Sequence, residues 1–324
     1  MGRPPAVAVF LENRPFFGAL LAHAPLLWEL RRRHPGRRIV AFAPFEEAHL
    51  LRDLGAADAL VRYEPSFRCV RSHLRELRPE AIYLLRPYSF WLTAAVGLQP
   101  ARPRAGFRTR AGRLLLSRAV PHDVSLYRPR KYLALLPDLD HRSAPLDGFF
   151  RELAAGADRA ALPPDPFVAV LPGGGAGAFK LWGVERFLAV CHRLAGADPR
   201  LRFLFVLGRA EEHLLPAIEA ALGADRARVL LEAPVATIAA AALAAEAAVG
   251  NDCGPGHVFQ MCGCPYVCVM SDHDARAPQR TLEWLDAPNR PLAQVSPPGA
   301  PITAVPVEPV AAAVQRASAL RAGR

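Results

Sequence analysis

The sequence predicts an α/β protein made of two doubly wound, Rossmann-like domains. Short apolar runs alternate with helical segments along most of the chain, which is the pattern of parallel strands joined by helices. The length of 324 residues exceeds what one ordinary core needs and suits two domains. Hydrophobic residues make up 52% of the chain and charged residues 22%, as in packed globular proteins.

The alternation is clear near the N-terminus. We predict strands at residues 6–11, 39–42, 59–63 and 81–85, and helices at residues 18–34, 45–54 and 66–77. Between residues 98 and 166 proline and arginine are frequent, and only residues 131–136 have the pattern of a helix. We expect the interdomain connection in this region, ending near Pro163-Pro164-Asp165-Pro166. The predicted domains are therefore residues 1–160 and 161–324.

The alternation resumes after residue 166. Strands are predicted at residues 167–171, 203–207, 229–231, 246–249 and 266–269, and helices at residues 184–194, 211–222, 235–245 and 258–262. A final helix at residues 307–320 is expected to pack back across the domains. Ligands of such folds bind at the carboxyl ends of the strands, so we expect a site in the cleft between the two sheets.

The basic composition raises the question of nucleic-acid binding. The net charge is +10 and the pI is near 9.9. The arginines are scattered through predicted helices and turns, as at Arg31 to Arg33, and no aromatic residues alternate with them. We therefore expect no nucleic-acid partner, because an anionic nucleotide or an anionic membrane face suits the same charge.

The sequence predicts a cytoplasmic protein with at most a peripheral membrane contact. No apolar run approaches the roughly 20 residues that a membrane span needs. Residues 1–11 lead directly into a strand pattern, so we expect no secretory signal. The six cysteines lack the spacing of a zinc site, as at Cys262-Gly263-Cys264, which predicts buried free thiols and no metal site.

The most informative stretch is the corner Gly-Asn-Asp-Cys-Gly-Pro-Gly-His at residues 250–257, between an apolar strand and a helix. Glycines let the backbone approach a ligand, and the bare N–H groups of a helix start suit a phosphate. Asp252 and His257 bracket the corner with an acceptor and a potential cation. Because a strand-to-helix turn also needs glycine and proline for structural reasons, the corner alone leaves both readings open.

A second loop, residues 171–182, is rich in glycine and contains Lys180 near its end. It satisfies only the loose dinucleotide fingerprint, and the residues around the lysine do not fit a Walker loop. Gly174, Gly175 and Lys180 instead suit the charge of a diphosphate. A plain glycine turn with a solvated lysine is the structural alternative.

A third segment follows the next predicted strand, at Gly208 to Glu212. The carboxylate of Glu211 or Glu212 can accept hydrogen bonds from ribose hydroxyls, and we count Gly208 with them as donor-binding. Acidic residues also favour any helix N-terminus electrostatically, so this second explanation stays open.

Together these motifs resemble those of the ADP-heptose:lipopolysaccharide heptosyltransferases, glycosyltransferase family 9. Lys180-Leu181-Trp182 is similar to the family's Lys-x-Trp, and Arg186-Phe187 to its Arg-Phe pair. Residues 251–257 are similar to its Asn-Asp-Ser-Gly-Pro-x-His corner, with Cys253 in place of serine. The likeness is strongest over residues 167–271 and weaker over residues 7–65.

The resemblance implies a GT-B fold, in which the C-terminal domain holds the nucleotide sugar and the N-terminal domain holds the acceptor. It also implies an inverting transfer from an ADP-type donor without a metal or another cofactor. The family's donor-binding residues correspond here to Lys180, Asp252, Cys253, Gly254, Gly256 and His257.

The first loop departs from the family's pattern. The family has a Gly-Asp pair at the start of its first helix, and that aspartate is taken as the base, whereas this chain has Gly18-Ala19. Alanine cannot accept a proton, and a missing base typically costs about 10²- to 10⁴-fold in rate. Glu12, at the end of the first strand, is our candidate base, with a solvated strand-end glutamate as the alternative. Asn13 and Gly18 are expected on the acceptor side.

We therefore predict a glycosyltransferase that moves a heptose or a similar sugar to a saccharide acceptor. That acceptor is either a lipopolysaccharide core or the scaffold of a secondary metabolite. Ala19 keeps a second class open, a catalytically silent family member that binds nucleotide or glycan as a scaffold or regulator. A sugar-nucleotide hydrolase or epimerase is a third class, and it needs a carboxylate that activates water.

Overall fold

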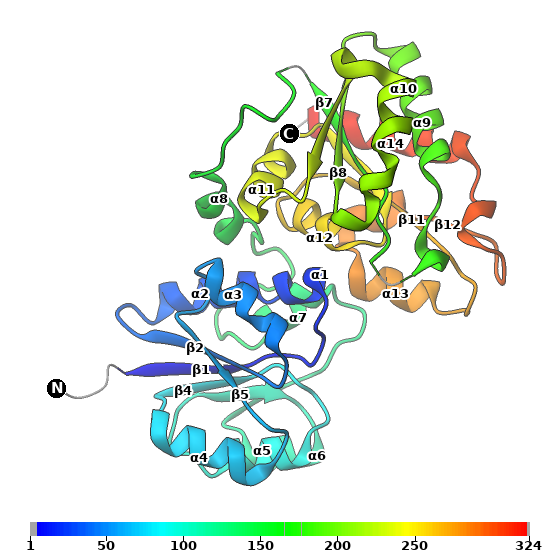
Figure 1. The fold of residues 1–324 in the computed structure, drawn as a ribbon. Coiled ribbons are helices and arrows are strands. Elements are labelled where there is room, and N and C mark those ends of the chain that lie inside the picture. The colour runs from blue at the N-terminus through cyan, green and yellow to red at the C-terminus, as the bar shows by residue number, and fades with distance from the viewer. Residues whose placement is uncertain (1–4, 165, 176, 323–324) are drawn as a thin grey trace. The chain divides into compact units, whose positions relative to one another are not determined.

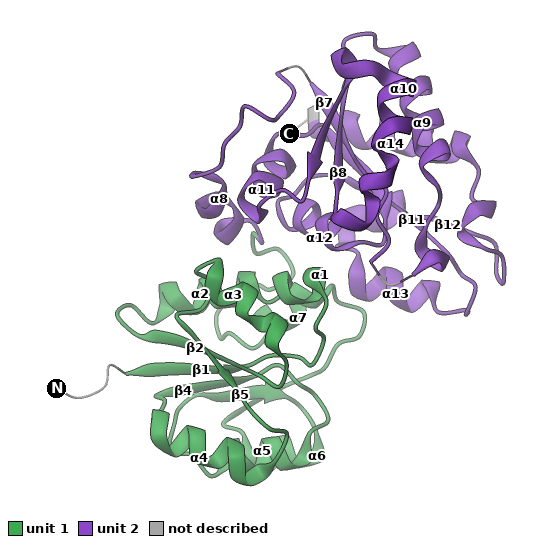
Figure 2. Ribbon diagram, viewed as in Figure 1, with its two compact units in different colours: residues 1–145 green, residues 146–324 purple. Residues whose placement is uncertain are grey.

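The computed structural model describes residues 5–164, 166–175 and 177–322. Asp165 of the predicted interdomain segment and Ala176 of the predicted glycine loop lie outside these residues. The chain forms two compact units, residues 1–145 and 146–324 (Figure 2). We predicted the boundary after residue 160. The segment before that point belongs to the second unit, because α8 (Gly148–Ala154) packs against α11 (Val235–Ala244).

The first unit is built on a six-stranded parallel sheet with the order β3-β2-β1-β4-β5-β6. Every residue of β1 is buried, as expected for a parallel strand with helices on both faces. Helices α4, α5 and α6 cover one face of this sheet, and α1, α2, α3 and α7 cover the other (Figure 1). The strands are β1 (Ala6–Phe10), β2 (Arg38–Ala43), β3 (Ala59–Arg62), β4 (Ala81–Leu84), β5 (Arg104–Phe107) and β6 (Arg118–Val120). The helices are α1 (Phe17–Leu21), α2 (Ala24–Arg33), η1 (Glu46–Ala48), α3 (His49–Asp53), α4 (Phe67–Leu77), α5 (Phe90–Gly97), α6 (Arg110–Leu115) and α7 (Arg128–Leu133).

The structure of the first unit differs from the sequence predictions at several elements. The helix predicted at residues 18–34 is two helices, because Pro25 lies in the first turn of α2, where its missing N–H is tolerated. Strands β5 and β6 fall in the region assigned to the connection. They were not predicted because they are short and contain arginine or glycine. Helix α5 was also missed, since it is apolar on all sides and has no helical periodicity.

The second unit has a parallel six-stranded sheet with the order β12-β11-β10-β7-β8-β9. Helices α9, α10 and α14 lie on one face, and α8, α11 and α12 on the other (Figure 1). The strands are β7 (Phe167–Leu171), β8 (Arg202–Leu207), β9 (Ala227–Leu231), β10 (Ala247–Asn251), β11 (Tyr266–Met270) and β12 (Gln294–Val295). The other helices are η2 (Ala178–Lys180), α9 (Val184–Ala197), η3 (Arg209–Leu214), α10 (Leu215–Arg226), α12 (Gly254–Met261), α13 (Ala277–Trp284), η4 (Ala287–Leu292), η5 (Ile302–Ala304) and α14 (Val307–Ala322).

The final helix, α14, was expected to pack back across the domains. It packs against α9, β10 and β11 of its own unit. Val310, Val314 and Ala317, at spacings of four and three, are fully buried in the core of this unit. The C-terminal helix therefore covers one face of the second sheet.

The two sheets share one strand order, since each has its first strand beside its fourth. At that pair the connections leave toward opposite faces of the sheet, which makes it a topological switch point where ligands of such folds bind. The switch points lie at β1 and β4 in the first unit and at β7 and β10 in the second. Within the described part of the chain, no helix combines the length and the apolar character needed to cross a membrane.

Candidate functional site

Both glycine-containing segments of the second unit start at its switch point. The glycine loop follows β7, and the corner at residues 251–257 follows β10, which pairs with β7 in parallel. The two segments leave the same edge of the sheet, the edge formed by the carboxyl ends of the strands. The fold therefore brings together residues that lie more than 70 positions apart in the sequence.

Asn251, the last residue of β10, fastens the glycine loop to the corner. Its side chain is fully buried. Its Nδ2 donates to the carbonyl oxygen of Pro172 at 2.6 Å, and its Oδ1 accepts a hydrogen bond from the backbone N–H of Trp182 at 3.3 Å. Trp182 is itself fully buried and donates from Nε1 to the carbonyl oxygen of Val305 at 2.9 Å. Both ends of the loop are thus fixed, and Lys180 is held beside the corner.

Lys180 and Asp252 form the charged centre of the site. The Nζ of Lys180 lies 2.5 Å from Oδ2 of Asp252 and 3.4 Å from its carbonyl oxygen. The Nε2 of His257 lies 3.9 Å from Oδ1 of the same carboxylate. The side chains of Lys180 and Asp252 are 22% and 12% exposed, so solvent and ligands can reach both. The structure thus brings together the lysine, the aspartate and the histidine that we predicted.

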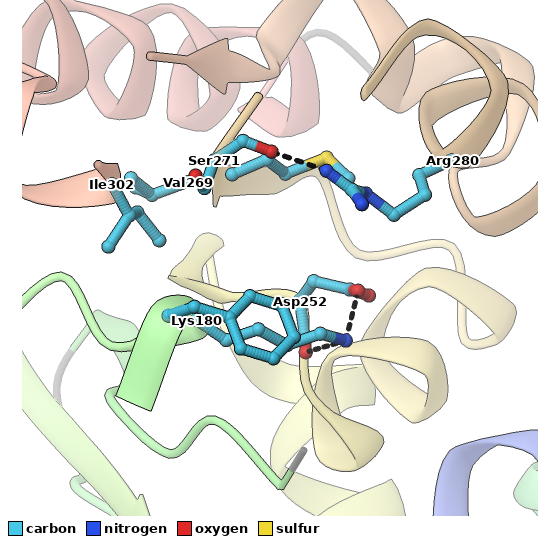
Figure 3. Close-up of a pocket in the computed structure, with 8 residues that line it drawn as sticks. Lys180, Asp252, Val269, Ser271, Arg280 and Ile302 are labelled. Atoms are coloured by element: carbon cyan, nitrogen blue, oxygen red, sulfur yellow. Dashed lines mark hydrogen bonds and ion pairs between the residues drawn. The ribbon is translucent and has the colours of Figure 1, made fainter. Parts of the chain in front are cut away.

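A shallow pocket opens at this centre. Lys180 and Asp252 point toward each other on one side, and Ser271 and Arg280 lie opposite (Figure 3). Arg280 pairs with Asp274 at 2.7 Å and donates to the carbonyl oxygen of Ser271 at 2.5 Å. The lining also includes Phe179, Val269, Met270 and Ile302. The pocket is therefore lined by two cationic side chains, an aromatic ring and several apolar side chains.

In the first unit, Glu12 follows β1 at the switch point and is held by two side chains. Its Oε2 accepts hydrogen bonds from Tyr132 Oη at 2.6 Å and from Arg128. Its Oε1 has a longer contact, 3.4 Å from Nε of Arg14. Burial acts to raise the pKa of Glu12, but the charge of Arg128 and the hydrogen bonds outweigh it and lower this pKa to about 2. Glu12 is thus fully ionised at neutral pH, with Oε1 as its more available oxygen.

His23 packs against this group. Its Nε2 accepts a hydrogen bond from the backbone N–H of Glu12 at 3.3 Å, and its Nδ1 lies 3.0 Å from the carbonyl oxygen of Leu20. Its ring stacks on Tyr132 with centroids 4.8 Å apart. Burial lowers the pKa of His23 to about 4, so the ring is neutral at pH 7. His23 therefore positions Glu12 without adding a charge.

Comparison with known proteins identifies the family of this chain. The sequence profile of glycosyltransferase family 9 (heptosyltransferase) matches residues 70–284, more than half of the chain. The chain belongs to glycosyltransferase family 9. None of the curated proteins matches the sequence.

Solved structures of this family share the fold. The E. coli ADP-heptose lipopolysaccharide heptosyltransferase II is 19% identical with a TM-score of 0.61, covering 98% of this chain and 99% of that one. A glycosyl transferase family 9 protein from Veillonella parvula is 16% identical with a TM-score of 0.64, covering 99% of both chains. E. coli heptosyltransferase WaaC with ADP is 15% identical with a TM-score of 0.64, covering 96% and 99%. The predicted family, the α/β GT-B fold and a glycosyltransferase activity are thereby confirmed.

At the corner, close packing requires glycine at two positions, Gly250 and Gly256. A Cβ on Gly256 would lie 2.5 Å from the hydroxyl oxygen of Tyr266, and a Cβ on Gly250 would lie 2.5 Å from the carbonyl oxygen of Leu171. Tyr266 is buried, and its hydroxyl donates to the carbonyl oxygen of Asn251. Gly256 therefore leaves room for a buried tyrosine under the corner, and Gly250 leaves room for the close approach of β7. Our assignment of Gly256 to donor binding stays a prediction.

Cys253 and Gly254 lie where the corner turns into α12, as N-cap and first helical residue. The Sγ of Cys253 lies 3.8 Å from the hydroxyl of Tyr266, and burial raises the pKa of this thiol to about 11. The side chain that replaces the family's serine is thus a neutral, weak hydrogen-bond donor at pH 7.

The segment predicted to hold the ribose has a local hydrogen bond of its own. The Oε2 of Glu211 accepts from the backbone N–H of Gly208 at 3.0 Å, and a Cβ on Gly173 would lie 3.0 Å from Oε1 of Glu211. Glu211 is therefore next to the glycine loop, while Glu212 is exposed. In the loop itself, Gly174 is buried beneath Leu181 and Gly175 is exposed.

The first loop of the first unit has no carboxylate at the family's aspartate position. Ala19 is 6% exposed within α1, and Gly18 is buried beside it. Asn13 is exposed in the turn after Glu12. Glu12 therefore remains the candidate base, and the roles of Asn13 and Gly18 stay predictions.

Sequence reasoning missed Arg280 and Ser271 as pocket residues. Arg280 lies on α13, which was not predicted, and the sequence around it contains no motif. The composition could have drawn further attention to Lys180, because only Lys131 and Lys180 among the 40 lysine and arginine residues are lysines. A lysine at position 180 in so arginine-rich a chain favours a function that needs the compact ammonium group.

The predicted absence of a metal site stays a prediction. All six cysteines are free thiols, and five of them are buried. Among the described residues, no three His, Cys, Asp or Glu side chains are grouped closely enough to hold a metal ion.

Proposed function

We propose that the protein transfers a heptose or a similar sugar from an ADP-type nucleotide sugar to a saccharide acceptor. The lipopolysaccharide core and a secondary-metabolite scaffold are the two acceptor classes that we consider. The arrangement of Lys180, Asp252 and His257 at the switch point, beside the N-terminus of α12, carries this proposal. The names of solved family members support the donor class, since WaaC has been solved with ADP and with ADP-2-deoxy-2-fluoro heptose.

The donor diphosphate is proposed to bind between Lys180 and the start of α12. The ammonium group of Lys180 can bridge Asp252 and a phosphate oxygen, and the backbone N–H groups after Cys253 point toward an anion at a helix N-terminus. Arg280 supplies a second cation across the pocket. These groups can stabilise the charge that develops on the leaving diphosphate. The proposed reaction therefore uses protein cations for this task and needs no metal.

The chemical step proposed here is a single displacement. The acceptor hydroxyl oxygen forms a bond to the anomeric carbon as the bond from that carbon to the diphosphate oxygen breaks. The bonding electrons leave with the diphosphate, and the hydroxyl proton passes to a base. Attack from the side opposite the diphosphate inverts the anomeric configuration.

We propose Oε1 of Glu12 as the proton acceptor. Oε2 accepts hydrogen bonds from Arg128 and Tyr132, whereas Oε1 has a longer contact, 3.4 Å from Nε of Arg14. A carboxylate with a pKa near 2 is a weak base. It suffices when the proton leaves late, after the hydroxyl oxygen has begun to bond to an electron-poor anomeric carbon and has become more acidic.

The proposal is tested by titrating the purified chain with ADP, GDP, UDP and CMP in a calorimeter. We expect ADP to bind most tightly at one site per chain, and ADP-heptose to compete with it. Binding of UDP or GDP in preference to ADP would replace the proposed donor class. If no nucleotide binds, the corner at Asp252 is a structural turn and a silent scaffold becomes the better account.

A further inference from the structure

Three aromatic rings lie together at the edge of the first sheet where its strands end. Phe107 is the last residue of β5, Tyr88 lies in the turn after β4, and His122 lies shortly after β6. The ring centroids of Phe107 and His122 are 4.8 Å apart, and those of Tyr88 and His122 are 5.6 Å apart, both in an edge-to-face arrangement. The hydroxyl of Tyr88 also lies 3.3 Å from Nδ1 of His122. We call Tyr88, Phe107 and His122 the aromatic cluster.

The three members of the cluster differ in exposure. Tyr88 is 76% exposed, whereas Phe107 is buried and His122 is half-buried. A side chain as exposed as Tyr88 adds little hydrophobic stabilisation to the fold, because most of its ring stays in water. Phe107 and His122 therefore support a tyrosine ring that remains open to a ligand.

The backbone of Tyr88 is in the left-handed region, with φ of +63°. Pro87 and Tyr88 form the turn between β4 and α5. This conformation is unfavourable for a residue with a Cβ, and a turn with proline before such a position normally has glycine or asparagine there. A tyrosine here thus destabilises the fold where glycine would not, and strained residues of this kind cluster at active sites and ligand-binding sites.

The aromatic cluster shares its edge of the sheet with Glu12. Strands β1 and β4 are neighbours, and Phe10 pairs with Leu84. Glu12 comes two residues after Phe10, and Tyr88 comes four residues after Leu84. Neighbouring strands are roughly 4.8 Å apart, so both residues start from adjacent points of this edge. Ligands of such folds bind there, which places the exposed ring on the side of the sheet that the candidate base also occupies.

We propose that the ring of Tyr88 stacks on the apolar face of a sugar ring in the acceptor. A pyranose carries hydroxyl groups around its rim and C–H groups on its faces. A tyrosine ring can therefore cover one face while the hydroxyl groups stay free to form hydrogen bonds. The contact with His122 fixes the orientation of the tyrosine ring. This inference rests on the proposed transfer to a saccharide, and it adds a side chain that recognises the acceptor.

The test measures saccharide binding separately from nucleotide binding. The probe is a deacylated lipopolysaccharide core oligosaccharide that lacks heptose. Saturation-transfer NMR gives its Kd and shows which of its protons contact the protein. Tyr88→Gly removes the ring and relieves the backbone. Arg78→Gly is the matched control, because Arg78 is also exposed and has φ of +49°, but it lies before β4, at the opposite edge of the same sheet.

We expect Tyr88→Gly to bind the oligosaccharide about tenfold more weakly than the wild type, the loss for roughly 55 Å² of apolar surface returned to water. Tyr88→Phe keeps the ring and should stay within about threefold of the wild type, and Arg78→Gly should leave the Kd unchanged. The melting temperature should be equal or higher in both glycine variants, because glycine tolerates positive φ. In the wild type, the C–H protons on one face of a sugar ring should receive the strongest saturation.

Three results would overturn the inference. The wild type could fail to bind the oligosaccharide, or Tyr88→Gly could bind it as tightly as Arg78→Gly does. A melting temperature that falls by several degrees in Tyr88→Gly would show that the tyrosine stabilises the fold instead. ADP titration of the same proteins keeps the proposed function apart, because Lys180 is in the other unit. A wild type that binds the oligosaccharide but not ADP would refute the proposed function and leave the role of Tyr88 standing.

Discussion

Replacing Lys180 with alanine should weaken ADP binding far more than adenosine binding. The ammonium group lies 2.5 Å from Asp252 and is the proposed contact to the diphosphate. Loss of a hydrogen bond to a charged group costs about 1.5–3 kcal/mol, or roughly 10- to 150-fold in Kd. The Asp252 carboxylate is only 12% exposed and then repels the phosphates, by up to about 3 kcal/mol at 5 Å and an effective dielectric constant of 20. We therefore expect about a hundredfold loss for ADP and less than about threefold for adenosine.

Two further variants refine this prediction. Lys180→Arg retains the charge and should lose less than about tenfold for ADP. Adding Asp252→Asn to Lys180→Ala removes the repulsion and should recover part of the lost ADP affinity, which a double-mutant cycle measures. Calorimetric titration of each variant with ADP and adenosine provides the data. Equal losses for the two ligands, or no loss for ADP, would refute the placement of the diphosphate at Lys180.

Glu12→Gln should lower kcat by about 10²-fold at saturating donor if Glu12 is the base, and full turnover by this variant would exclude that role. Because the pKa of Glu12 is about 2, the pH profile of wild-type kcat should show no acid limb due to Glu12 above about pH 3. Tyr132→Phe removes a hydrogen bond that lowers this pKa and should move the acid limb to higher pH. The pKa of His23 is lowered from 6.5 to about 4 in the folded protein, so between these pH values the unfolded chain binds one more proton. The contribution of His23 to the free energy of unfolding is therefore complete above pH 6.5 and falls by about 1.4 kcal/mol per pH unit down to pH 4. In urea unfolding, the free energy of unfolding should decrease between pH 7 and pH 5 by about 2 kcal/mol less in His23→Gln than in the wild type. Gly256→Ala should destabilise the second unit by about 1–3 kcal/mol through overpacking against Tyr266. Adding Tyr266→Phe to this variant should restore part of the lost thermal stability. An unchanged melting temperature for Gly256→Ala would contradict the close contact.

The fold class could be predicted because the buried strands are long, apolar runs. Strands β1 and β7 are buried along their whole length, and so they appear in the sequence without polar interruption. Strands β5 and β6 are short and start with arginine, so local pattern could not distinguish them from a loop. Their place in the sheet depends on the pairing of β5 with β4 and of β6 with β5, which is a tertiary property.

The candidate site could be predicted to the extent that its residues belong to local motifs. Asp252 and His257 lie in one corner, and Lys180 ends a recognisable loop. Arg280 could not be found, because it reaches the pocket from a helix whose position depends on the packing of the second unit. The same limit applies to Glu12, whose low pKa depends on Arg128, 116 residues further along the chain.

The most direct test of the account is the stereochemistry of the transferred sugar. The purified chain is incubated with ADP-heptose and a lipopolysaccharide core that lacks heptose, and proton NMR reads the anomeric configuration of the product. We expect ADP release that depends on the acceptor and a product with the anomeric configuration opposite to that of the donor. Retention of configuration, or release of free heptose at the same rate without the acceptor, would contradict an inverting transferase.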